Sequence, residues 1–236
     1  MKKTKLISAM LLAAVLLSAC GGTKTVDGTK SGSDAASEQT AEKTSAGGSI
    51  DVQIGSSPET MDPALNSAAD AANMILHAFT GLLMVDKNQN IVGGLAEKWE
   101  TSEDGLTWTF HLRPDLKWSD GSDLTAEDFV YSWKRLADPA LAAPYGYDLL
   151  NMIEGYDEAA KGNLDALVVS APDSNTFVVK LSSPCTYFDK IASFISTSPV
   201  QKVTVEENGD EWSTKPETYV TSGPYKMTEF VDGDLI

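Results

Sequence analysis

The chain carries few side chains suited to nucleophilic or metal chemistry. Its 236 residues include two cysteines and two histidines. His77 and His111 lie in neither an HExxH run nor a Ser/His/Asp arrangement, and the sequence contains no CxxC pair. Asp62 has no acid–base partner near it in the sequence, so we expect it to shape a loop. The sequence therefore predicts no catalytic residue, no metal site and no cofactor, which argues against an enzyme.

The first twenty residues combine a basic start, a short apolar stretch and a cysteine. Three lysines precede the apolar residues 6–17, a stretch shorter than the about 20 residues needed to span a bilayer. Residues 1–19 are therefore predicted to be a secretory signal peptide. The run L-S-A-C that ends at Cys20 resembles the bacterial lipobox, which implies cleavage before Cys20 and diacylation of its sulfur. Two acyl chains would anchor the lipoprotein to the membrane.

The charge balance excludes several classes of partner. The formal net charge is −16, and removal of the signal lysines makes the remaining chain more acidic. No basic patch is present to neutralise phosphates, which argues against nucleic acid and against polybasic attachment to lipid. Cys185 has no partner once Cys20 is lipidated, so we expect no disulfide and a small buried side chain at Cys185.

Residues 20–48 are predicted to be a lipidated cysteine followed by a flexible tether. From residue 21 to residue 48 the chain is rich in Gly, Ser, Thr, Ala, Lys, Asp and Glu, and Val26 is its only sizeable apolar residue. Such a segment cannot bury enough apolar surface to become ordered. Its end-to-end reach is about 30 Å. Order is expected to begin at residue 49.

The region around residues 108–136 is predicted to be a strand, a turn and a helix. Trp108, Phe110 and Leu112 alternate with polar residues, which is typical of a strand with one buried face. A Ser-Asp-Gly turn follows, and Thr125 with Asp128 then resembles a capping box. Apolar residues recur at helical spacing from there until an Asp-Pro pair ends the helix.

Other elements are predicted from the same patterns. The tryptophans at positions 99, 108, 118 and 133 are expected to be core residues rather than ligand platforms. The remaining predictions are a strand at 50–54, a turn at 58–63, a helix at 68–79, a hairpin formed by 164–169 and 176–181, and a helical run at 187–192.

Two adjoining runs carry a specific resemblance to a known family. The runs F-x-L-R-x-x-x-K-W-S-D-G (110–121) and L-T-A-E-D-F-V-Y-S-W (124–133) closely resemble the extracytoplasmic oligopeptide-binding proteins of ABC importers. The resemblance covers nearly all of residues 49–236. It implies an α/β (mixed α+β) fold, namely the two-lobe periplasmic-binding-protein fold of type II with an extra small lobe.

The resemblance also divides the ordered part of the chain. It implies that 49–80 begin the large lobe, that 81–203 form the inserted small lobe, and that 204–236 return into the large lobe. Proteins of the family are longer, and their second ligand-binding lobe falls after residue 236. We therefore expect the 236-residue product to have unpaired strand edges and a tendency to aggregate.

The function implied by the resemblance is peptide capture without chemistry, followed by delivery to a membrane permease and its ATPase. Ser67, Ala68 and Ala69 lie where the family contacts the ligand backbone, although Ser67 replaces an acidic residue of the best-known pattern. The run A-A-P-Y that ends at Tyr145 matches a family run whose tyrosine contacts the peptide, so Tyr145 is the leading candidate, and Tyr147 is a weaker one. The aspartate that binds the peptide amino terminus in the family lies in the absent lobe.

Two alternatives to oligopeptide import stay open. The same fold in relatives takes dipeptides, nickel chelates, sugars or haem. A lipid-anchored adhesin or signalling receptor could use the fold without transport. We expect a monomer outside the cytoplasm, either on the outer face of a Gram-positive membrane or in the periplasm of a Gram-negative cell.

Overall fold

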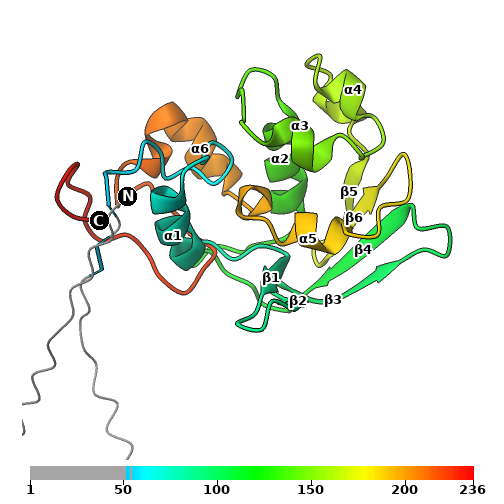
Figure 1. The fold of residues 1–236 in the computed structure, drawn as a ribbon, viewed down its shortest axis with the longest axis horizontal. Helices are drawn as coiled ribbons and strands as arrows, with labels where there is room; N and C mark the ends of the chain where they lie inside the picture. Colours follow the sequence, from blue (N-terminus) through cyan, green and yellow to red (C-terminus); the bar gives the residue numbers. More distant parts are fainter. Residues whose placement is uncertain (1–51, 54) are drawn as a thin grey trace, which may run out of the picture. The chain divides into compact units, whose positions relative to one another are not determined.

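The computed structural model describes residues 52, 53 and 55–236 (Figure 1). The predictions for the signal peptide, Cys20 and the tether at 21–48 lie outside the described residues. The α-helices are α1 (Ala69–Ala78), α2 (Ala126–Ala137), α3 (Gly146–Leu150), α4 (Tyr156–Ala159), α5 (Phe188–Ala192) and α6 (Lys202–Asn208). The strands are β1 (Leu83–Val85), β2 (Ile91–Gly93), β3 (Ala96–Thr101), β4 (Thr107–Leu112), β5 (Val169–Asp173) and β6 (Thr176–Lys180). The 3-10 turns are η1 (Leu164–Ala166), η2 (Ile195–Thr197) and η3 (Gly209–Ser213).

The larger sheet of the described residues has the strand order β3-β4-β6-β5, and its neighbouring strands are antiparallel. In the central strand β4, Phe110 lies opposite Trp99 of β3 and Phe177 of β6. Trp108, Phe110 and Leu112 are buried, and they alternate with half-buried residues. The predicted strand and its buried face are therefore confirmed. A separate antiparallel pair, β1 with β2, precedes this sheet.

Helix α2 packs on β5 and β6 and forms the centre of the core (Figure 1). The rings of Phe129 and Trp133 lie 5.6 and 5.1 Å from the ring of Phe177, measured between centroids. Trp133 also meets Phe188 of α5 at 6.0 Å, and its Nε1–H donates to the Thr197 carbonyl at 3.1 Å. Because this indole is fully buried, its hydrogen bond removes the cost of an unpaired donor.

The tryptophan predictions hold at three of the four positions. Trp108, Trp118 and Trp133 are all buried in the core, whereas Trp99 is half-buried and packs against it. The sequence analysis did not single out Trp212, which is also buried. The predicted buried state of Cys185 is confirmed, and its thiol is free.

The beginning of α2 is fixed by the predicted capping residues. The Thr125 backbone N–H donates to Oδ2 of Asp128 at 2.8 Å, which completes a capping box in which Asp replaces the usual Glu. The Ala126 N–H donates to the carbonyl of Ser174, in the turn between β5 and β6, at 2.8 Å. The hairpin turn and the helix start therefore hold each other in place.

The predicted hairpin is confirmed, but its first strand begins later than expected. Residues 164–166 form the turn η1 instead of a strand, and β5 starts at Val169. The backbone carbonyl of Asn163 accepts the Ala166 N–H at 3.0 Å, which closes this turn. Residues of η1 pack against α2, and Asp165 forms an exposed ion pair with Lys134 of that helix at 2.7 Å. Local alternation of apolar residues could not reveal this tertiary contact.

The strand predicted at 50–54 finds no support in its described residues. Only Val52 and Gln53 are described, and neither belongs to a strand. Val52 is 70 % exposed. The helix predicted at 68–79 is confirmed as α1, and the helical run at 187–192 is confirmed as the shorter α5.

Candidate functional site

Asp62 organises the loop that leads into α1. Its side chain is 2 % exposed, and its two oxygens accept the two Nη groups of Arg135 on α2, at 3.2 Å from Oδ1 and 2.6 Å from Oδ2. Oδ1 also accepts the Ala64 backbone N–H at 2.9 Å, and Oδ2 accepts Nε1–H of Trp212 at 3.4 Å. The expected loop-shaping role of Asp62 is confirmed, with a distant arginine as its partner.

An aromatic cluster lies next to this ion pair. Phe79, Trp212 and Tyr219 contact one another, with ring centroids 5.4 to 6.3 Å apart. The Tyr219 hydroxyl donates to the carbonyl of Met61 at 2.8 Å. Burial of this hydroxyl, with a smaller contribution from the Asp62 carboxylate, raises the pKa of Tyr219 above its ordinary value. The segment before α1 is thus fixed both by charge and by packing.

Alkaline pH is expected to weaken the fold through Tyr219. The hydroxyl has its ordinary pKa of about 10 in the unfolded chain and a higher pKa in the folded chain, so the folded state holds its proton more tightly. The stabilisation is complete below pH about 10 and is lost as the pH rises above that value. Urea unfolding over an alkaline pH series would measure it. Tyr219→Phe should reduce this pH dependence, and an unchanged pH dependence in the variant would contradict the assignment.

The predicted ligand segment continues directly from the Asp62 loop. Asn66 is 4 % exposed, and its Oδ1 accepts the Ala68 backbone N–H at 3.1 Å. Ser67 and Ala69 are exposed, and Ala68 is the extended N-cap residue of α1. Within residues 55–236, the backbone N–H and C=O of Ser67 have no hydrogen-bond partner. Ser67 is therefore an exposed residue between two residues that hydrogen bonds hold in place.

Tyr145 and Tyr147 lie at the start of α3. Tyr145 is the half-buried N-cap residue, and its ring meets Phe194 edge-on at 5.5 Å. Tyr147 is 66 % exposed, and its ring meets Tyr156 at 6.0 Å. Phe194 adjoins η2, against which α1 also packs. Tyr145 and the helix that follows Ser67 therefore approach the same turn, although no hydrogen bond or ring contact joins them among the described residues.

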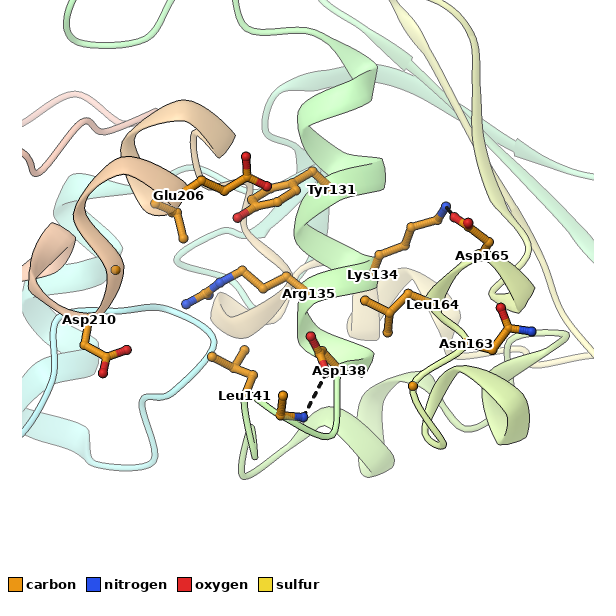
Figure 2. A pocket seen from close by; sticks show the side chains of 14 residues that line it. Tyr131, Lys134, Arg135, Asp138, Leu141, Asn163, Leu164, Asp165, Glu206 and Asp210 are labelled. Carbon is orange, nitrogen blue, oxygen red and sulfur yellow. Dashed lines mark hydrogen bonds and ion pairs between the residues drawn. The ribbon is translucent and has the colours of Figure 1, made fainter.

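A groove beside α2 has a volume of about 690 Å³ (Figure 2). Residues of α2, η1 and α6 line it, together with the loop that follows α2. Lys134 and Arg135 contribute to it, and both are already paired, with Asp165 and with Asp62 respectively. None of the five residues predicted to contact a ligand lines this groove.

The two histidines occupy ordinary structural settings. Nδ1 of His77 lies 2.6 Å from the Asn73 carbonyl in α1, and Nε2 of His111 lies 3.1 Å from Oε1 of Glu100 on the neighbouring strand. Across the described residues, no group of three or more His, Cys, Asp or Glu side chains is arranged to hold a metal ion. No helix in this part of the chain is long and apolar enough to cross a membrane.

Sequence reasoning missed the partners of Asp62. Arg135 and Trp212 follow Asp62 by 73 and 150 residues, so no local spacing connects them with it. Correlated substitution of Asp62 and Arg135 in related sequences is a signal that could have revealed the pair.

Comparison with known proteins places this geometry in context. Residues 90–236 match the family described as bacterial extracellular solute-binding proteins, family 5 middle. The chain is 44 % identical over 185 residues to the periplasmic oligopeptide-binding protein OppA of Salmonella typhimurium, covering 77 % of this chain and 34 % of that protein. It is 33 % identical over 230 residues to the oligopeptide-binding protein OppA of Bacillus subtilis, and the match covers 96 % of this chain and 40 % of that protein.

A solved structure supports the same relationship. The crystal structure of Haemophilus influenzae OppA in complex with the peptide RPPGFSPFR matches with a TM-score of 0.72 and 37 % sequence identity. The match covers 76 % of this chain and 35 % of that one. The chain thus spans little more than a third of the length of these relatives. The expected mixed α/β fold of this class of binding protein is confirmed for the matched part.

Proposed function

Because this chain belongs to family 5 of the bacterial extracellular solute-binding proteins, we propose that it takes part in capturing oligopeptides outside the cytoplasm for an ABC importer. The observation that carries the proposal is the 44 % identity to an oligopeptide-binding protein over 185 residues. In this role the protein performs no reaction. It holds a peptide and transfers it to the permease, which works with an ATPase.

The exposed backbone at Ser67 suits this role. An extended peptide that pairs with its N–H and C=O, which have no partner within residues 55–236, would gain affinity from main-chain hydrogen bonds, which do not depend on the peptide sequence. Tyr145 would add an aromatic contact beside Phe194. Affinity would then come mainly from the peptide backbone, and selectivity among side chains would be broad.

Tyr145 provides the test of this function. Tyr145→Ala is expected to weaken binding of tetra-alanine by at least about tenfold, because aromatic anchors dominate binding energy in such sites. Isothermal titration calorimetry of the full chain would measure the dissociation constant. Tyr187→Ala is the matched control, since Tyr187 is the N-cap residue of another short helix and is 55 % exposed. Equal affinities of the two variants would contradict the role of Tyr145, and no binding by the unmodified chain would contradict the function.

The proposed division into lobes has support from hydrogen bonds between distant segments. The Gly223 N–H donates to the Ala78 carbonyl at 2.8 Å, and the Thr80 N–H donates to Oγ of Ser222 at 3.0 Å. These contacts bring the chain after residue 204 back beside the segment that ends at residue 80. We propose that both belong to the large lobe, and that 81–203 form the small lobe.

Lipid anchoring at Cys20 is the last part of the proposal. Cys20→Ser is expected to abolish labelling by radioactive palmitate and to move the protein from the membrane fraction to the soluble fraction, because serine cannot form the thioether. Cys185→Ser is the matched control, since Cys185 is the other cysteine of the chain and is buried. Labelling that persists in Cys20→Ser, or that disappears in Cys185→Ser, would contradict the anchor.

A further inference from the structure

The loop that carries Ser67 owes its conformation to a residue of a different part of the chain. We propose that Arg135 is a positioning residue for peptide binding, because its ion pair with Asp62 sets the place of the exposed backbone at Ser67. The proposal rests on the proposed function above. It assigns a role in recognition to α2, none of whose residues was predicted to contact the ligand.

A series of hydrogen bonds leads from Arg135 through Asp62 to Asn66, the residue before Ser67, and the Asn66 side chain holds Ala68, the residue after it. The guanidinium holds both oxygens of Asp62, and Oδ1 of Asp62 also accepts the Ala64 N–H at 2.9 Å. The backbone carbonyl of Asp62 accepts the N–H groups of Leu65 and Asn66 at 3.2 and 3.1 Å. Asn66 then accepts the Ala68 N–H through its side chain. Ser67 is the one residue of 66–68 that these bonds leave free on the surface.

The geometry of the pair explains why arginine is required. A guanidinium binds a carboxylate through two parallel N–H groups, and this fixes the orientation of the carboxylate as well as its distance. A lysine ammonium supplies the same charge without that orientation. The Asp62 side chain is 2 % exposed and that of Arg135 is 13 % exposed, so the carboxylate depends mainly on protein donors. The Trp212 indole completes the shell of donors around Asp62.

The neighbouring residue Lys134 offers a matched comparison. Figure 2 shows that the side chains of Lys134 and Arg135 leave α2 in different directions, Lys134 toward Asp165. Lys134 and Asp165 form an ion pair at 2.7 Å, in which Asp165 is 93 % exposed. Lys134 therefore shares the helix, the charge and the groove with Arg135, but its hydrogen bond and ion pair within residues 55–236 go to Asp165 and not to the loop at 62–68.

The experiment measures peptide affinity in Arg135→Lys and in the control Lys134→Gln, using the full chain and tetra-alanine. Arg135→Lys is expected to bind about tenfold more weakly, the factor that corresponds to about one lost hydrogen bond. Lys134→Gln is expected to bind like the unmodified chain. The indole N–H resonance of Trp212 should shift in Arg135→Lys alone, because Trp212 donates to Asp62.

N-methylated peptides distinguish positioning from a general loss of structure. Each tetra-alanine analogue carries one N-methyl group, at a different amide, and its affinity for the unmodified chain is compared with that of tetra-alanine. The analogue that loses the most affinity identifies the peptide amide that donates a hydrogen bond to the protein. In Arg135→Lys the same N-methylation is expected to lower the affinity by less than about twofold, because this variant already lacks the hydrogen bond to that amide. The proposal would be overturned if N-methylation lowered the affinity of Arg135→Lys as much as that of the unmodified chain. It would also be overturned if Arg135→Lys bound tetra-alanine as tightly as the unmodified chain does.

Two further outcomes are interpretable. If Arg135→Lys does not fold, the double variant Asp62→Asn with Arg135→Gln is used instead. It removes both charges together and so avoids an unpaired buried ion. N-methylation of the peptide is again expected to lower the affinity by less than about twofold. If the double variant keeps the full effect, the positioning role is wrong. If the unmodified chain binds none of the peptides, the proposed function fails first, and the two failures are therefore distinguishable.

Discussion

Replacing Arg135 by leucine is expected to lower the free energy of unfolding by about 3–5 kcal/mol, because it leaves Asp62 as an uncompensated buried charge. Asp62 is 2 % exposed and keeps only the Ala64 N–H and the Trp212 indole as donors in that variant. Urea unfolding followed by tryptophan fluorescence would measure the change. The loss should be visible as a lower midpoint at a similar dependence on denaturant concentration.

Two control variants separate burial from charge. Lys134→Leu removes an exposed ion pair from the same helix and should change the free energy of unfolding by less than about 1 kcal/mol. Asp62→Leu combined with Arg135→Leu removes both charges and should recover part of the loss, since no ion is then left unpaired. Equal effects of Arg135→Leu and Lys134→Leu would show that the Asp62 pair behaves as a surface pair.

Replacing Trp133 by alanine is the second large effect, with an expected loss of about 3–5 kcal/mol in the free energy of unfolding. The fully buried indole fills the space between Phe177 and Phe188, and it donates to the carbonyl of Thr197. The variant would therefore combine a large cavity with an unpaired carbonyl. Thermal or urea unfolding would measure the loss.

Two further substitutions divide the effect of Trp133 into its causes. Trp133→Phe keeps an aromatic ring but removes the donor to Thr197, and it should cost about 1–3 kcal/mol. Trp99→Ala should cost less than Trp133→Ala, because Trp99 is half-buried at the edge of the core. A smaller loss for Trp133→Ala than for Trp99→Ala would contradict the placement of Trp133 at the centre.

The elements that the sequence predicted correctly share one physical property. In β4 and in α2 a single face is buried, so the side-chain period reports the element and its inward face together. Capping and turn residues act within a few positions, and for this reason Thr125 with Asp128, and the turn between β5 and β6, could be located in advance.

The predictions that failed or stayed incomplete depend on distant contacts. The apolar residues Leu164 and Ala166 alternate with Asp165 and favoured a strand, but residues 164–166 form a turn that packs on α2. The partner of Asp62 was not predictable because Arg135 enters the loop from another element. The resemblance to known binding proteins could suggest Ser67 and Tyr145, but only the structure shows that the backbone of Ser67 has no hydrogen-bond partner within residues 55–236.

The position of β4 between β3 and β6 has a consequence for the rate at which the chain folds. The turn at 102–106 joins β3 to β4, whereas β6 begins at Thr176, after α2, α3 and α4. The pairing of β4 with β6 therefore requires closure of a long loop, and contacts between residues so distant in sequence slow folding. Until it closes, the apolar side of β4 with Trp108 and Phe110 lacks its cover. Substitutions that stiffen or shorten residues 113–175 should therefore change the folding rate, even where they touch no residue of the sheet.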